Sequence, residues 1–236
     1  MSDNKKPAIR FKGFDDDWEQ RKLGDICKVI TKGTTPKDKN WSGPVNYVKT
    51  ESIDKESGNI VNTCNTSLEE HNGFLKRSQL EANDILFSIV GTLGRVGVVK
   101  KKDLPANTNQ QIAIIRLEND NSNFMMNLLK TPVVESFIAS DSTIGAQPSI
   151  SLWQLDELAL CLPKLEEQEK IGQYFTNLDH LITLHQRKPF KPLLEEQEGQ
   201  LWQEKSQKRS YFAIITRNGL MFIKRGRLER SHWTSI

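Results

Sequence analysis

The stretch LPKLEEQEKIGQYFTNLDHLITLHQRK, residues 162–188, determines how this chain is organised. Pro163 suits a helix entry, because the first N–H groups of a helix have no intrahelical partner in any case. Glu166 and Glu167 follow in the first turn, where carboxylates interact favourably with the positive end of the helix dipole. The sequence therefore predicts one long helix over residues 163–188.

The apolar residues of this helix recur at steps of three and four, which places them on one face. A helix of about 25 residues is roughly 37 Å long, and such a stripe needs a partner surface. Two interpretations fit: the helix packs on its own domain, or it pairs with another helix in this chain or in a second one. For pairing, the expected face consists of Ile171, Phe175, Leu178, Leu181, Ile182 and His185.

Composition is that of an ordinary soluble protein. Of the 236 residues 36% are hydrophobic and 27% charged, and no apolar run approaches the ~18 residues of a membrane span. The N-terminus lacks the apolar run of a signal peptide. Cys27, Cys64 and Cys161 are odd in number and widely spaced, which indicates a reducing cytoplasm rather than a disulfide framework or a zinc site.

The net charge of +3 conceals an uneven distribution. Residues 201–236 hold eight Lys or Arg and two acids, whereas residues 1–200 hold 25 basic and 28 acidic residues. Overall charge therefore does not favour nucleic-acid binding by the main part of the chain, and any such binding must depend on local patches.

Short apolar runs between polar loops predict an α+β domain with a mixed β-sheet before the long helix. Gly91, Gly94 and Gly97 lie between two apolar runs, which indicates a hairpin rather than a dinucleotide-binding loop. Residues 124–139 predict a helix that breaks near Pro132. The strands are expected at residues 27–30, 45–48, 85–90, 95–100 and 112–117.

The sequence contains no convincing catalytic or metal-binding constellation. It has neither the Asn-Pro-Pro-Tyr of amino-methyltransferases nor the Pro-Asp of metal-dependent nucleases, and it has no Walker A loop. His180 and His185 are five residues apart, a poor spacing for one metal ion. We therefore expect no cofactor and no metal.

Polar loop residues instead suit the reading of DNA bases. Asn and Gln can pair with adenine, and Arg or Lys with guanine. The expected DNA-contacting residues are Thr34, Lys37, Lys39, Asn40, Arg95, Asn109, Gln110, Gln111 and Gln147. Of these, Lys37 and Lys39 are expected on phosphates, and Arg95, Gln110 and Gln147 on bases. By residue type alone, each of them is equally compatible with an ordinary surface or turn role.

Two motifs resemble the specificity (S) subunits of type I restriction–modification enzymes. Residues 10–26, RFKGFDDDWEQRKLGDI, are similar to the segment that opens each target recognition domain in that family. The long helix matches the conserved region of the family at Glu167, Gln168, Ile171, Phe175, Leu178, Asp179 and Ile182. Weaker matches are GTTP at 33–36, NDILFSIVGTLGRVG at 83–97 and AQPSISLWQL at 146–155.

The resemblance covers about residues 7–188 and implies a non-catalytic subunit that reads double-stranded DNA. In that family two recognition domains are each followed by a long helix, and the two helices pack antiparallel like a coiled coil as a spacer between half-sites. Methyltransferase (modification) subunits and restriction subunits then join the complex. The implied organisation is an N-terminal segment (1–19), a target recognition domain (20–162), a spacer helix (163–188) and a divergent basic tail (189–236).

The chain departs from the family pattern in two places. It has one recognition domain instead of two, and after Lys188 it carries Pro189 and Pro192 where the family continues its helix. A truncation, a shifted frame or a recombined end would explain both, and we expect pairing with a second half-subunit or a second copy. Two other hypotheses stay open: a stand-alone DNA methyltransferase or nuclease, and a protein-interaction module that uses only the helix face.

Overall fold

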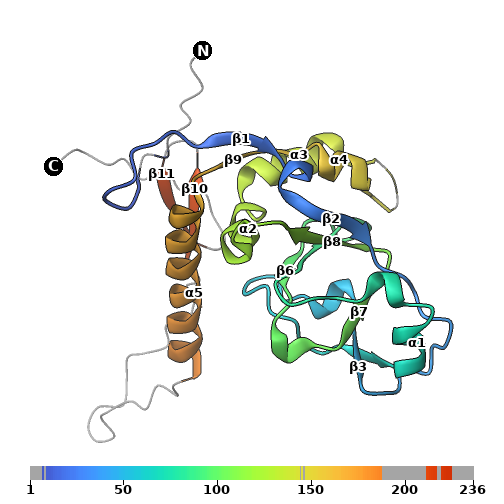
Figure 1. Ribbon diagram of the computed structural model, residues 1–236. Coiled ribbons are helices and arrows are strands. Elements are labelled where there is room, and N and C mark those ends of the chain that lie inside the picture. Colours follow the sequence, from blue (N-terminus) through green and yellow to red (C-terminus); the bar gives the residue numbers. More distant parts are fainter. Residues whose placement is uncertain are drawn as a thin grey trace, which may run out of the picture.

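The long helix α5 (Leu165–Arg187) is the largest single element of the structure, a computed structural model. It stands beside a body of short strands and helices, residues 19–162 (Figure 1). The structure describes residues 7, 9–143, 145, 147–187, 211–216 and 219–224. Within this part of the chain no helix is both long and apolar enough to cross a lipid bilayer. The predicted α+β class and the long helix are confirmed.

An antiparallel four-stranded sheet forms the centre of the body. Its buried strands correspond to the continuous apolar runs in the sequence, because a strand covered on both faces shows no alternation. The hairpin predicted at the glycine-rich stretch is confirmed: Ile85 lies opposite Val98. In spatial order the strands are β2 (Cys27–Lys32), β8 (Ile112–Leu117), β5 (Ile85–Ser88) and β6 (Val96–Val98).

A second sheet of three strands is mixed, since its central strand pairs antiparallel with one neighbour and parallel with the other. Its order is β4 (Cys64–Thr66), β3 (Val45–Val48) and β7 (Ala106–Thr108). The sequence shows no clear signal for β4 or for the short helix α1 (Leu68–Asn72). The reason is that β4 buries only Thr66 fully, and α1 buries none of its residues.

Helices α2 (Ser122–Leu128) and α3 (Pro132–Asp141) replace the single interrupted helix that the sequence predicts over residues 124–139. Pro132 begins α3, where its missing N–H has no cost. The short helix α4 (Leu152–Asp156) follows, and Ser151 caps it by accepting a hydrogen bond from the Gln154 N–H at 3.1 Å.

The two ends of the body meet at the start of α5. β1 (Glu19–Lys22) pairs antiparallel with β9 (Ala159–Leu162), so that Glu19 lies opposite Leu162. A short strand contributed from each end thus closes the body just before the long helix begins. Farther along the chain, β10 (Tyr211–Thr216) and β11 (Gly219–Lys224) form an antiparallel hairpin.

The first turns of α5 belong to the core of the body. Ile171 is 6% exposed and lies in the main apolar cluster, against which Phe175 also packs. A Cβ on Gly172 would lie 2.6 Å from Asn121 Oδ1, so glycine permits the close approach of α2. Ile171 and Phe175 thus pack on their own body, because α2 covers this part of the stripe, and pairing of a second helix through them stays a prediction.

Polar anchors accompany this packing at the start of α5. The buried Gln168 side chain accepts a hydrogen bond from the Asn121 N–H at 3.0 Å and donates to Asp120 Oδ1 at 2.7 Å. The buried Glu167 carboxylate accepts two hydrogen bonds from the Arg10 guanidinium, at 2.8 Å and 2.5 Å. These contacts give the Glu-Gln pair of the sequence motif a structural reason, since each side chain ties a different segment to the helix.

Farther along α5 the helix leaves the body. Asp179 lies near Lys130: burial raises the pKa of the Asp179 carboxyl, and the Lys130 ammonium opposes this rise. Burial in turn lowers the pKa of Lys130. Beyond this point Leu181 and Ile182 are exposed, whereas Leu178 is half-buried. Pairing through these three residues stays a prediction, and the side chain of His185 lies outside the described residues.

Candidate nucleic-acid interface

Several loops leave the four-stranded sheet at one end. β2 and β5 both run antiparallel to β8, with Lys32 opposite Ala113 and Ser88 opposite Ile112, and β5 and β6 form a hairpin. The segments that follow β2 and β5 and precede β8 and β6 therefore emerge side by side. With neighbouring strands about 4.8 Å apart, this row of loops is about 14 Å wide.

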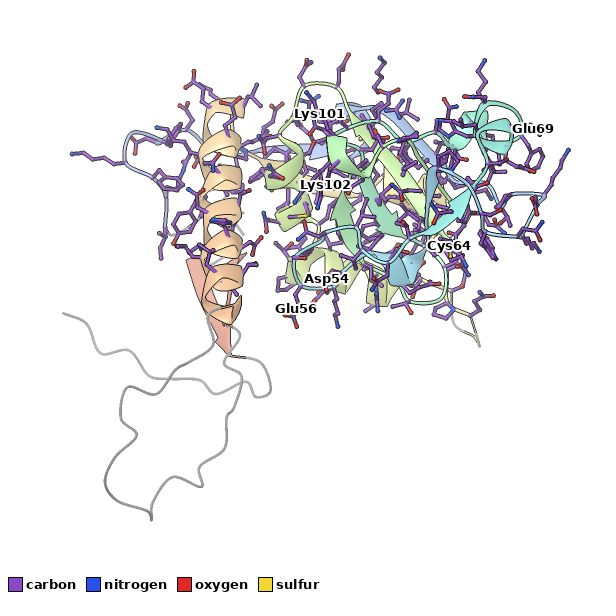
Figure 2. The ribbon with its side chains drawn as sticks, turned by 90° about the horizontal axis from the view of Figure 1, so that it is seen from below. Asp54, Glu56, Cys64, Glu69, Lys101 and Lys102 are labelled. Atoms are coloured by element: carbon purple, nitrogen blue, oxygen red, sulfur yellow. The ribbon has the colours of Figure 1, made fainter. Side chains whose placement is uncertain are left out.

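This end of the sheet points away from α5. In Figure 1, β2 runs from the side of α5 towards α1, and in Figure 2 the labelled Glu69 of α1 lies at the far end of the body. The segment after β2 reaches α1, where the Asp38 N–H donates to Glu70 Oε1 at 3.2 Å. We call residues 33–41, 49–50, 91–95, 109–111 and 147–149 the loop edge.

The GTTP segment is fixed to the loop edge by its main chain. The Gly33 N–H donates to the Ile112 carbonyl oxygen at 3.2 Å, and the Thr34 N–H donates to that of Thr108 at 2.8 Å. The Thr35 hydroxyl donates a hydrogen bond to Gln110 Oε1. The structure thus brings together Thr34 and Gln110, two of the residues predicted to contact DNA.

Replacing Gly33 with alanine is expected to displace this segment. A Cβ on Gly33 would lie 2.1 Å from the Thr108 carbonyl oxygen and 2.3 Å from that of Asn109, and main chain cannot give way as a side chain can. We expect a loss of about 1–3 kcal/mol in the free energy of unfolding, measured by urea denaturation. Gly13→Ala is the control, because a Cβ there meets nothing within 4 Å and only its left-handed φ opposes the change. Equal losses for the two variants would contradict this account of Gly33.

Lys37, Lys39 and Asn40 are exposed on the same segment. The Lys37 ammonium lies 4.6 Å from the centre of the Phe74 ring, and the Asn40 N–H donates to Asp38 Oδ1 at 2.9 Å. Their exposure is compatible with contacts to phosphate.

Asn109 and Gln111 complete the turn between β7 and β8. Asn109 Oδ1 accepts a hydrogen bond from the Gln111 N–H at 3.1 Å, and Asn109 Nδ2 donates to Gln111 Oε1 at 3.2 Å. The two side chains therefore satisfy one another. Gln110, between them, is exposed and of these three is the one best placed to meet a ligand.

Arg95 and Gln147 reach the loop edge from other segments. Arg95 Nη1 donates to the carbonyl oxygens of Thr50 and Ile53, at 3.3 Å and 3.1 Å, so the guanidinium holds the 3-10 turn η2 (Thr50–Ser52). Base reading by Arg95 stays a prediction, and this geometry adds a structural role. Gln147 is exposed, and the next residue, Pro148, accepts a hydrogen bond from the Gly91 N–H at 2.9 Å.

A family model for the type I restriction modification DNA specificity domain matches residues 15–191. The chain belongs to this family. It is 34% identical over 98 residues to the type I restriction enzyme EcoBI specificity subunit of Escherichia coli, a match covering 41% of this chain and 20% of that protein. It is 27% identical over 177 residues to the putative type I restriction enzyme MjaX specificity subunit of Methanocaldococcus jannaschii, covering 71% of this chain and 40% of that protein.

The fold also agrees with a solved structure. The HsdS subunit from Thermoanaerobacter tengcongensis has a TM-score of 0.55 and 20% identity, over 72% of this chain and 44% of that one. The chain thus spans less than half the length of these relatives. The resemblance to type I specificity subunits is confirmed at the level of family and fold.

Two cations of this specificity domain are absent from the predicted set: Lys49 belongs to the loop edge, and Arg77 contacts it. Arg77 Nε donates to Thr34 Oγ1 at 2.8 Å, and Lys49 follows Val48, which lies opposite Thr108 in the parallel pair of β3 and β7. Local sequence gives no signal for either residue, since both depend on pairing between distant segments.

Among the described residues, no three His, Cys, Asp or Glu side chains gather as metal ligands would.

Proposed function

We propose that this chain reads one half of a bipartite site in double-stranded DNA and directs type I methyltransferase and restriction subunits to that site. The observation that carries this proposal is the convergence of the predicted contacts, from segments far apart in the sequence, on the loop edge. Loops held by a rigid sheet suit sequence reading, because the sheet fixes polar side chains whose identity can vary. The chain itself has no catalytic role, needs no cofactor and acts in the cytoplasm.

Charge at the loop edge supports this assignment. Lys37 and Lys39 come from the segment after β2, Lys49 follows β3, and Arg77 contacts Thr34. Neutralisation of phosphates by such residues supplies most of the sequence-independent affinity for DNA. These residues thus provide the local positive charge for DNA binding that the overall charge of the chain does not provide.

The rest of the chain takes the roles that the family suggests. The distal part of α5 pairs with the helix of a second half-subunit or of a second copy, antiparallel, and sets the distance between two half-sites. Methyltransferase subunits assemble on this pair, and restriction subunits join through the complex. The proposed parts are the N-terminal segment (1–19), the target recognition domain (20–162), the spacer helix (163–188) and the basic tail (189–236).

Two substitutions at the loop edge are expected to affect DNA binding in different ways. Gln110→Ala should relax the methylated motif at one position, at a cost of ~1–3 kcal/mol in discrimination if the amide pairs with a base. Lys37→Ala should weaken binding to all sequences about equally and flatten its salt dependence. The measurements are methylome sequencing of cells that carry each variant and DNA binding by the assembled complex at several salt concentrations.

Lys102→Ala provides the matched control. Lys102 is also exposed, but it follows β6, which runs away from the loop edge, and in Figure 2 its label lies nearer to α5 than that of Glu69. This variant should keep both the motif and the salt dependence. An unchanged motif in folded Gln110→Ala, Arg95→Ala and Gln147→Ala variants would place the reading surface elsewhere. DNA methylation by the purified chain alone would establish the rival hypothesis of a stand-alone enzyme.

A further inference from the structure

Lys37 and Lys49 both lie over aromatic rings, but Phe74 under Lys37 is 48% exposed, whereas the ring under Lys49 packs on a buried residue. The Lys49 ammonium lies 4.1 Å from the centre of the Trp41 ring, a cation–π distance. The Trp41 ring in turn packs on Tyr47, with 5.3 Å between ring centres. Tyr47 is fully buried, and its hydroxyl donates to the Thr34 carbonyl oxygen at 3.0 Å. Lys49 is thus fixed to the sheet through two aromatic residues in contact, whose ring planes are tilted by 41°.

The aromatic residues beneath Lys49 keep their contacts near neutral pH, and one of them, Trp41, adopts an unfavourable backbone conformation. Burial raises the pKa of Tyr47 to about 12, so its hydroxyl keeps its proton, and the hydrogen bond to Thr34, near neutral pH. Trp41 has a φ of +53°, in the left-handed region that bulky residues rarely adopt. Strained residues of this kind are often found at functional sites, where the surrounding structure holds them in place.

The main chain at Lys49 is held from the other side as well. The turn η2 begins at the next residue, and Arg95 Nη1 donates to two of the carbonyl oxygens around it. Despite this enclosure Lys49, which is half-buried, makes no ion pair with a carboxylate in the part of the chain that the structure describes. A positioned cation without a counter-ion suits an electronegative ligand.

We propose that Lys49 reads a base of the half-site, through the acceptor atoms O6 and N7 on the major-groove edge of a guanine, and that Trp41 is its positioning residue. This inference rests on the proposed function. A lysine on a flexible loop acts as a point charge and suits phosphate, whereas a lysine held over an indole ring presents its N–H donors from a fixed place. Guanine offers two adjacent acceptors to such a donor.

The test uses the complete chain in its complex with type I methyltransferase subunits and a library of random DNA duplexes. Lys49→Met should lower the preference for guanine at one position by about 10-fold and leave the other positions unchanged. Lys49→Gln should shift that position towards adenine, which a glutamine side chain pairs with. Lys39→Met, an exposed lysine of the same edge, should weaken binding to all sequences equally.

Two further measurements separate a reading role from a structural one. Duplexes with 7-deazaguanine at the affected position should bind more weakly to the wild-type complex but no more weakly to the Lys49→Met complex. Trp41→Leu should relax the same position, and Trp41→Phe, which keeps an aromatic face, should restore it. Uniform weakening by Lys49→Met would make it a phosphate contact and overturn the inference, while the proposed function would stand. A wild-type complex that selects no motif would overturn both.

Discussion

The Ile182→Asp variant is expected to fold normally and to lose the pairing of two half-subunits. Ile182 continues the apolar stripe of Ile171 and Phe175 beyond the point where α2 covers it, and the residue is 44% exposed. A carboxylate at this place would be buried in the seam between two helices, where an unpaired charge is strongly unfavourable. We expect pairing to weaken by about 100-fold or more, equivalent to roughly 3 kcal/mol, as measured by sedimentation of the purified chain.

His180→Asp is the matched control for the pairing experiment. His180 is exposed and lies two residues before Ile182, which places it about 200° away around the helix. The same charge on the opposite face should leave the mass in solution unchanged. Leu178→Asp is less selective, because Leu178 is half-buried and its loss could disturb the body. An unchanged mass for folded Ile182→Asp would show that the distal stripe does not form the pairing surface.

The Arg10→Ala variant is expected to lose about 3–5 kcal/mol in the free energy of unfolding. Arg10 and Glu167 form a bidentate pair, and their side chains are only 11% and 2% exposed. Removing the guanidinium leaves the Glu167 carboxylate enclosed without its partner, and this uncompensated charge causes most of the loss. Because the pair joins the N-terminal segment to α5, the segment should also become susceptible to proteolysis. Urea denaturation measures the stability, and limited digestion followed by mass spectrometry locates the opening.

A second ion pair joins the same two segments and serves as the control. Lys164 Nζ lies 2.6 Å from Asp16 Oδ2, but these side chains are 78% and 67% exposed. Solvent screens an exposed pair, so Lys164→Ala should leave stability nearly unchanged. Similar losses for the two variants would mean that burial does not determine the strength of these contacts. Rescue of Arg10→Ala by Glu167→Gln, which removes the buried charge, would confirm the physical reason.

The sequence by itself predicts the elements whose apolar pattern is strong. The continuous runs in β5 and β8, the break at Pro132 and the long helix are all found, because each depends on residues that are neighbours in the chain. The weakly buried β4 and α1 leave no such pattern. The same local information identifies most of the candidate DNA contacts by residue type, though not which of them act together.

The pairing of distant segments decides the rest. The apolar residues of α5 recur with one period throughout, yet α2 covers the first turns and leaves Ile182 exposed. The periodicity of the sequence therefore does not predict which part of the stripe is buried. Val48 and Thr108, the residues just before Lys49 and Asn109, lie opposite each other only because β3 and β7 run parallel. The sequence alone thus determines the family motifs, the long helix and the residue types available for DNA contacts. Tertiary structure decides which side chains share the loop edge, because sheet register and close packing depend on contacts between residues far apart in the chain.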